Sequence, residues 1–420
     1  MTKNNSKNRI LIVILLTIAG GFIYAMNCGI RNNYGIMLKS IVENSGTTIA
    51  SVSFVFAVAQ LTFGVVQPLF GILASKKGNF LTLAIGAILT TSGMLLAPYS
   101  KSILTLTICI GILLPAGTGA LSYGLIIGSV STKIPQKYMS TVSGIINASS
   151  GLGNSLMSPL LNTLIVGSGL AYAMKIFSIP MLAIIPVSYL ICKNSSKKVD
   201  DKVDNKEINT NAGFDTPISN KKIISTKELF TLALTDRTYI LLMIGFFTCG
   251  FHMAIITNHL PTEFMSFGFS SQQSSYAFSI YGITTIIGSV AAGILCDKFK
   301  MKNVLAFLYG LRPLTIILFF IVPKTIFTIT LIAGLFGISG ASTVSPVSGI
   351  IGKNFGSKYL ATLFGFVFLL HQIGGFISAW LGGILFEMMN SYSAIWTADI
   401  LLCTLAAIVS YMIYENKKTA

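Results

Sequence analysis

Charged side chains are scarce in this sequence of 420 residues. They make up 10% of it, whereas a soluble domain usually carries about 25%. Acidic residues are the scarcer kind, with 13 Asp and Glu against 29 Lys and Arg. Hydrophobic residues amount to 53%, and the mean hydropathy is +0.77. A chain with so little charge is expected to fold within a lipid bilayer rather than as a soluble domain.

The patterns of most enzymes are also missing. The six cysteines stand singly within apolar stretches, without the spacing of a disulfide framework or a zinc site. The sequence holds no G-x-x-x-x-G-K-S/T nucleotide loop, no H-E-x-x-H pair and no cluster of Ser, His and Asp. These absences argue against an ATP-driven pump and against an embedded protease or acyltransferase. We therefore expect a protein that is not an enzyme and that uses no metal or other cofactor.

The net charge of +16 could suggest a nucleic-acid partner, but the placement of the charge does not. Loops between the apolar runs alternate between basic ones and nearly uncharged ones, in which Lys101 and Lys324 are the main charges. The basic residues of the other loops and of the termini are Lys3, Lys7, Arg9, Lys76, Lys77, Lys133, Lys137, those between Lys193 and Lys227, Lys298, Lys300, Lys302, Lys353, Lys358, Lys417 and Lys418. This bias follows the positive-inside rule, which predicts a multi-pass protein of the cell membrane with both termini in the cytoplasm. Its surroundings are then the lipid bilayer, and no nucleic-acid partner is expected.

Apolar runs of about 20 residues, long enough to cross a hydrocarbon core of about 30 Å, recur along the chain. We predict twelve helical spans, because a helix satisfies its own backbone hydrogen bonds in lipid. They cover residues 10–40, 48–74, 79–98, 102–131, 138–166, 170–192, 237–263, 271–296, 303–322, 325–350, 358–386 and 392–414. The predicted domains are a six-helix bundle over 1–192, a polar cytoplasmic linker over 193–235 that ends in a short surface helix near 227–234, and a second six-helix bundle over 236–420.

The two bundles carry traces of a duplication. Cys28-Gly29-Ile30-Arg31 and Cys249-Gly250-Phe251-His252 read alike and stand 221 positions apart (252 minus 31). The same offset relates Gly119 to Gly340, Ala120 to Ala341, Gly128 to Gly349, Tyr138 to Tyr359, Gly144 to Gly365 and Gly153 to Gly374. A membrane protein built from two parallel repeats is typical of transporters whose site lies between the halves.

Two loops carry a family signature. Residues 71–78 read Gly-Ile-Leu-Ala-Ser-Lys-Lys-Gly, and residues 293–299 read Gly-Ile-Leu-Cys-Asp-Lys-Phe. Both resemble the G-x-L-x-D-R/K-x-G loop of the major facilitator superfamily, with Ser75 in place of the first Asp and Lys300 in place of the second copy's Gly. The resemblance covers nearly the whole chain. It implies the fold of that superfamily, an all-α membrane protein of twelve transmembrane helices in two pseudo-symmetric six-helix bundles.

Within that superfamily the chain resembles a bacterial branch related to monocarboxylate transporters. The matching stretches are residues 29–35, His259-Leu260-Pro261, Ser345-Pro346, residues 371–374 and Gly382-Gly383. The animal monocarboxylate transporters carry an Asp and an Arg on the eighth helix, where residues 284–289 of this chain hold no charge. The resemblance implies a small anionic solute as substrate.

A polar stripe marks the first span. Tyr24, Asn27, Arg31 and Tyr34 follow each other at spacings of three and four residues, which places them on one face of a helix. An Arg deep in a span usually faces a watery cavity or a partner, although it can also snorkel to the membrane surface. We expect Arg31 to bind the substrate, with Asn27 and Tyr34 as hydrogen-bond donors beside it.

Candidates in the other spans are fewer. His252 stands at the position equivalent to Arg31, and His371 and Gln372 lie within the eleventh span. Because histidine titrates near neutrality, His252 and His371 are candidates both for substrate binding and for proton coupling, or else neutral groups bonded to helix backbones. Asn147 of the fifth span and Tyr281 of the eighth are further candidates for the wall of the binding site.

The loop signature supplies candidate gating residues. In the superfamily that the chain resembles, the loop Asp binds a helix N-terminus of the other half and holds the cytoplasmic side shut. The residues expected to act in this way are Gly71, Ser75, Gly293, Asp297 and Lys298. Arg312 and Asp399 stand in the ninth and twelfth spans, which are peripheral in that fold, so a structural or gating role is expected for both.

The sequence thus predicts a secondary active transporter that moves a small organic anion by alternating access, with coupling to protons as the expected energy source and a monomer as the functional unit. The alternative is an exporter of drugs or of neutral or cationic solutes with the same fold. Such pockets usually hold a carboxylate within the membrane, and Glu263, Asp297, Glu387 and Asp399 all lie towards the ends of spans.

Overall fold

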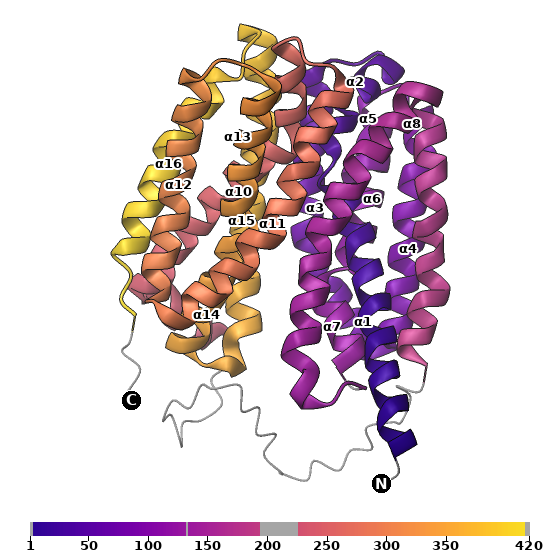
Figure 1. The fold of residues 1–420 in the computed structure, drawn as a ribbon, viewed down its shortest axis with the longest axis vertical. Coiled ribbons are helices and arrows are strands. Elements are labelled where there is room, and N and C mark those ends of the chain that lie inside the picture. Colours follow the sequence, from indigo (N-terminus) through magenta and orange to yellow (C-terminus); the bar gives the residue numbers. More distant parts are fainter. Residues whose placement is uncertain (1–2, 132, 194–225, 416–420) are drawn as a thin grey trace.

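The computed structural model describes residues 3–131, 133–193 and 226–415. Within these ranges the chain is helical and contains no strand (Figure 1). Eleven helical runs in this part are long and apolar enough to cross a membrane. One of them, in α8 (Gln136–Cys192), is folded back at Gly169 (φ 84°, ψ 167°), so it forms two crossings. The prediction of twelve spans in an all-α fold is therefore confirmed.

The remaining helices of the N-terminal half follow the predicted spans closely. They are α1 (Lys3–Arg31), α2 (Tyr34–Ser45), α3 (Ile49–Lys77), α4 (Asn79–Leu96), α5 (Ile103–Leu106), α6 (Leu114–Ala120) and α7 (Tyr123–Ser131), with η1 (Ala97–Tyr99) after α4 and the π-helical η2 (Thr107–Leu113) before α6. The first span is broken at Asn32 and Asn33. Asn33 stabilises the break by donating from Nδ2 to Gly29 O (2.6 Å) and to Asn154 Oδ1 (3.1 Å).

The C-terminal half repeats this order. It comprises α10 (Arg237–Ser266), α11 (Ser271–Lys298), α12 (Met301–Ile321), α13 (Ile326–Ser339), η3 (Ala341–Thr343), α14 (Val344–Phe355), α15 (Ser357–Met389) and α16 (Ser393–Tyr411). The short helix α9 (Thr226–Thr235) occupies the place predicted for a surface helix. It buries Leu229 and Ala233 on one face. The rest of the predicted linker, residues 194–225, lies outside the described residues.

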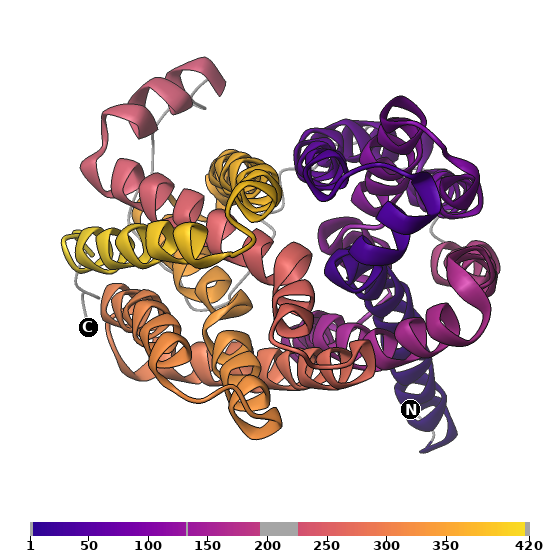
Figure 2. The same cartoon turned by 90° about the horizontal axis from the view of Figure 1, so that it is seen from above.

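The two halves stand side by side as separate bundles (Figure 2). They meet where α3 packs on α15, α8 on α11 and α2 on α10. Glycines allow the close approach of α8 and α11, since a Cβ added to Gly282 would lie 2.7 Å from Gly151 O. On the side opposite the chain termini the halves are also joined by hydrogen bonds, from Ala50 N to Glu387 Oε1 (2.8 Å) and between Asn162 and Gln272 (2.8 Å).

The halves are apart on the side where the chain termini lie, which we call the terminus side. Four glycines on the terminus-side halves of α3, α8, α11 and α15 have no atom within 4 Å of an added Cβ: Gly71, Gly144, Gly293 and Gly365. Two of them, Gly144 and Gly365, are equivalent by the 221-residue offset. Among the described residues, the space beside these glycines is therefore open on the terminus side, whereas the halves are in contact on the opposite side.

Candidate functional site

Arg31 lies at the end of α1 and reaches toward α3. Its Cζ is 4.1 Å from the centroid of the Phe63 ring, which is a cation–π contact. The side chain is half-buried. Within the described part of the chain it joins none of the three ion pairs, Lys39–Glu43, His252–Asp399 and Lys353–Glu415. Its guanidinium therefore keeps N–H donors available for an anion.

A row of rings leads from Arg31 to His371 across the interface between the halves. Phe63 of α3 packs edge-on against Phe368 of α15, with 6.1 Å between ring centroids. Phe368 in turn stacks on His371 at 5.5 Å and an interplanar angle of 8°. The structure thus brings together, near the middle of the two bundles, a cation of one half and an imidazole of the other.

The surroundings of His371 leave one of its nitrogens free. Its ring packs on Phe246 at 4.9 Å, and Nδ1 is buried without a hydrogen-bond partner among the described residues. The next residue, Gln372, is buried against α3, since a Cβ added to Gly64 would lie 2.9 Å from its Cγ. Arg31, His371 and Gln372 thus all lie at the packing of α3 against α15, where the two halves meet.

Tyr281 and Asn147 lie on the two helices that meet across the interface. Tyr281 of α11 is buried, stacks on Phe278 at 5.0 Å and donates from Oη to Met253 Sδ (3.7 Å). It also lies within electrostatic reach of Arg31. Asn147 of α8 is exposed and stands near the terminus-side opening, one turn from Gly144.

Two residues of the predicted polar stripe have partners within the N-terminal bundle. Asn27 donates from Nδ2 to Leu121 O (2.7 Å) inside the N-terminal bundle. Tyr34 belongs to α2, beyond the break, and stacks on Phe56 at 4.7 Å. The prediction of one continuous helical face is corrected here, because α1 ends at Arg31 and the chain changes direction at the two asparagines that follow.

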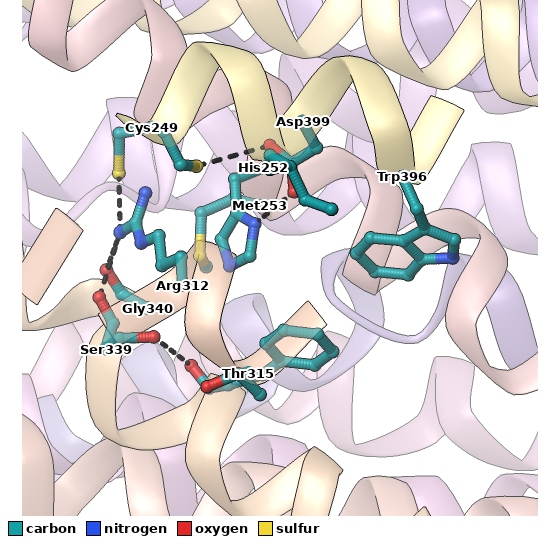
Figure 3. Close-up of polar contacts among 12 residues, drawn as sticks. Cys249, His252, Met253, Arg312, Thr315, Ser339, Gly340, Trp396 and Asp399 are labelled. Atoms are coloured by element: carbon teal, nitrogen blue, oxygen red, sulfur yellow. Dashed lines mark hydrogen bonds and ion pairs between the residues drawn. The ribbon is translucent and has the colours of Figure 1, made fainter. Parts of the chain in front are cut away.

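His252 lies within the C-terminal bundle rather than beside Arg31. It is fully buried, and its Nδ1 is 2.6 Å from Oδ2 of Asp399 on α16 (Figure 3). The second carboxylate oxygen, Oδ1, accepts from Cys403 Sγ at 3.3 Å. The sequence by itself does not pair Asp399 with His252. An acid within an apolar span was the available signal, because such a group needs a partner in the bundle interior.

Arg312 is also fully buried within this bundle. Its Nη2 donates to Ser339 O (2.9 Å) and Gly340 O (3.1 Å) and also contacts Cys249 Sγ (3.3 Å). Nη1 and Nε have no partner among the described residues. We call the group formed by Cys249, His252, Arg312, Asp399 and Cys403 the buried polar cluster.

Three members of the buried polar cluster offer metal-ligating atoms. Those of His252, Asp399 and Cys403 lie within 4.8 Å of one another. They are one ligand short of a closed tetrahedral zinc site, and all three already share hydrogen bonds. The guanidinium of Arg312 also lies within electrostatic reach of Cys403. We therefore interpret the cluster as a hydrogen-bond network.

The predicted gating residues stand at the terminus-side ends of α3 and α11. Gly71 and Gly293 face open space. Ser75 bonds within its own helix, from Oγ to Ile72 O (2.8 Å), and Asp297 and Lys298 are exposed. None of the three ion pairs among the described residues includes Asp297. In this open state the ends of the two signature loops are thus free of the other half.

A cavity of about 590 Å³ opens on the opposite side, within the C-terminal bundle. Glu263 lines it and accepts a hydrogen bond from Trp396 Nε1 (2.5 Å). The other lining residues are Ser266, Phe267, Phe320, Lys324, Phe386, Asn390, Ser391, Tyr392 and Ser393. None of the predicted substrate-binding residues belongs to this cavity.

Comparison with known sequences places this arrangement among transporters. The family model described as Major Facilitator Superfamily matches residues 20–311 and 242–420. An uncharacterized MFS-type transporter of Bacillus subtilis, YcxA, is 23% identical over 95% of both chains. Monocarboxylate transporter 10 of Rattus norvegicus is 24% identical over 87% of this chain and 71% of its own length. Monocarboxylate transporter 12 of Homo sapiens is 22% identical over 86% and 72%, respectively.

Solved structures share the fold. The nucleoside transporter NupG, in a mutant form, superposes with a TM-score of 0.71 at 15% identity, over 96% of this chain and 100% of its own. A D-xylose-proton symporter gives the same TM-score and identity over 97% and 99%. At this level of identity the likeness concerns the arrangement of the helices alone.

Proposed function

The chain belongs to the Major Facilitator Superfamily and is a multi-pass membrane transporter, and on that premise we propose that it is a secondary active transporter of a small organic anion. It works by alternating access of a site between the two bundles, and coupling to protons supplies the energy. The monocarboxylate transporters among its relatives support a carboxylate as the solute.

The observation that carries this proposal is the state of Arg31. A guanidinium in the membrane interior is costly unless it meets water or a partner. Here it rests on the Phe63 ring, and no carboxylate of the described residues pairs with it. A planar guanidinium fits a carboxylate with two parallel hydrogen bonds and stays charged at any physiological pH. An anionic substrate would therefore complete the site.

The arrangement also suggests how binding and transport are linked. Arg31 belongs to one half and His371, with its free Nδ1, to the other. A small anion held by both would draw the bundles together on the terminus side, where they now stand apart. Asp297 is then free to bind a helix N-terminus of the other half, which favours a carboxylate by about 0.3–1 kcal/mol when exposed. Ser75 carries no charge, so the equivalent contact of α3 is weaker.

We further propose that the terminus side faces the cytoplasm of a cell whose plasma membrane holds the protein as a functional monomer. The basis is the concentration of Lys and Arg on that side, among them Lys76, Lys77, Lys298 and Lys300. The structure is then open to the cytoplasm.

The test of the proposed function is equilibrium binding to purified protein. A thermal-shift screen of small carboxylates, sugars, amino acids and cationic dyes finds the ligand, because a bound ligand raises the unfolding temperature. Arg31→Gln should then weaken binding by about 2–5 kcal/mol, the loss expected for a charge contact in a partly dry cavity. Arg31→Lys should restore part of it, since an ammonium cannot form the paired contact.

The matched control is Lys39→Gln. Lys39 forms an exposed pair with Glu43 at 3.9 Å, which contributes little to stability and none to the site. Unchanged ligand affinity in a folded Arg31→Gln protein would exclude the anchor role and favour the exporter of neutral or cationic solutes.

A further inference from the structure

The fourth and tenth spans are broken at equivalent positions. The fourth is interrupted at Leu121 and Ser122, between α6 and α7, and the tenth at η3, between α13 and α14. The 221-residue offset carries Leu121 onto Ser342, within η3. Each break separates a half-helix on the opposite side from one on the terminus side, α7 in one bundle and α14 in the other. The duplication has thus kept a hinge position in each half.

A broken helix leaves carbonyl oxygens without partners, which must be satisfied when they are buried. In the N-terminal half the neutral amide of Asn27 does this, by donating to Leu121 O at 2.7 Å. In the C-terminal half a charged group does it instead. Nη2 of Arg312 donates to the carbonyls of Ser339 and Gly340, at 2.9 and 3.1 Å, where α13 ends (Figure 3).

The guanidinium of Arg312 also connects this break to the candidate substrate site. The same Nη2 is 3.3 Å from Cys249 Sγ, and the thiol lies beside the side chain of His371. The backbone of α10 touches α15 at the same level, because Gly250 leaves no room for a Cβ against His371 O. A continuous chain of contacts therefore runs from His371 through Cys249 and Arg312 to Gly340.

Gly340 is closely packed by side chains of α10 and α11. A Cβ added there would lie 3.1 Å from Met253 Sδ of α10 and 3.4 Å from Tyr281 Oη of α11. Beyond the break, α14 leads through Gly356 into α15, which carries His371. A shift of His371 thus reaches α14 by two routes, along the chain and through the guanidinium.

We propose that Arg312 is a positioning residue that holds the break of the tenth span and transmits displacements of His371 to α14, and so to the terminus-side opening. The proposal rests on the proposed function in that it takes His371 as part of the substrate site. The break of the N-terminal half is held by the neutral amide of Asn27, which donates to Leu121 O within its own bundle.

Hydrogen exchange of the ligand-free, full-length protein tests whether Arg312 holds the break of the tenth span. Arg312→Gln should speed amide exchange over residues 338–350 by about tenfold or more, the factor expected when a charge-assisted hydrogen bond is lost. The exchange rate of Arg312→Lys should lie between those of Arg312→Gln and the natural protein, because an ammonium still donates to carbonyls. Residues 119–131 of the equivalent N-terminal hinge serve as the internal reference. The matched control is Thr315→Val, one turn along the same helix, where Thr315 Oγ1 bonds only Leu311 O (2.8 Å).

A double-mutant cycle tests whether displacements of His371 reach α14 through Cys249 and Arg312. His371→Gln should change exchange over residues 338–350, and this change should be clearly smaller in the Cys249→Ala and Arg312→Gln backgrounds, where only the route along α14 and α15 remains. Additive effects, or equal acceleration in both hinges, would overturn the proposal. No substrate takes part in these measurements, so their failure would leave the anion-binding proposal intact, and a failure of Arg31 to bind an anion would leave this one intact.

Discussion

At the scale of single residues, the same side chain has two different settings in this protein. Arg31 is half-buried, and its guanidinium makes a cation–π contact with the Phe63 ring. Arg312 is 0% exposed and donates to two carbonyls and a thiol. A buried charge without partners would cost several kcal/mol, so Arg312 is explained by what it already binds. Arg31, in the proposed function, is explained by the anion that it can still bind.

The two candidate histidines also differ in their partners, since His252 is paired with Asp399 whereas Nδ1 of His371 has no partner among the described residues. Their role in proton coupling is tested by replacing both. If protons drive transport, replacing both His252 and His371 by Gln should abolish proton-driven accumulation in proteoliposomes and leave substrate exchange. Glutamine keeps the hydrogen bonding but does not titrate near neutrality. His259→Gln is the control, because its Nε2 is engaged with Ala379 O at 2.8 Å, within the C-terminal bundle. Full accumulation in the double variant would leave exchange or uniport as the mechanism.

At the scale of elements, the contacts between the halves depend on small residues. Without a hydrophobic driving force between helices in lipid, close packing of backbones provides the association. The crossing of α8 and α11 is the clearest case, since a Cβ on Gly282 would lie 2.6 Å from Ser155 N and 2.7 Å from Gly151 O. The helices can approach only because neither carries a side chain there.

Gly282→Ala should therefore be destabilising by about 1–3 kcal/mol, the usual effect of overpacking, and should lower the thermal unfolding temperature of the purified protein. Gly167→Ala on α8 is the matched control, because a Cβ there meets nothing within 4 Å. An equal unfolding temperature for the two variants would show that the crossing of α8 and α11 has room for a Cβ at position 282, which would contradict the prediction.

At the scale of the whole molecule, the two bundles are held on one side only. The hydrogen bonds Ala50–Glu387 and Asn162–Gln272 join them on the opposite side, while the terminus side is open. Hydrogen bonds of this kind contribute about 0.5–1.5 kcal/mol each. Their loss can be offset by new contacts on the terminus side, as the proposed alternating access requires.

The proposed orientation of the molecule in the membrane predicts which positions reagents reach. In a background without native cysteines, single cysteines at Lys101 or Lys324 should react with an impermeant thiol reagent in intact cells. A cysteine at Asn205, in the linker outside the described residues, should react only after the cells are opened. Labelling at Asn205 in intact cells would reverse the topology.

The helical spans, the duplication and the uneven distribution of Lys and Arg could be predicted from the sequence alone. These properties are local or periodic, because the length of an apolar run and the charge of the loop beside it decide whether and how it crosses a membrane. The breaks were harder to predict. The interruption at Asn32–Asn33 lies within a predicted span, and the helical spacing of polar residues runs across it to Tyr34, so spacing alone does not reveal the bend.

Only the tertiary structure decided which polar residues meet. Asp399 and His252 are 147 positions apart, and Arg312 finds its acceptors in the backbone of another span. Neither contact leaves a periodic signal, because a main-chain carbonyl is offered by every residue and a helix can present its one acid to any neighbour. The equivalence of Arg31 and His252 in the repeat predicted a shared position. Their surroundings place one against the interface between the halves and the other inside a bundle, because burial and partners depend on how the helices pack.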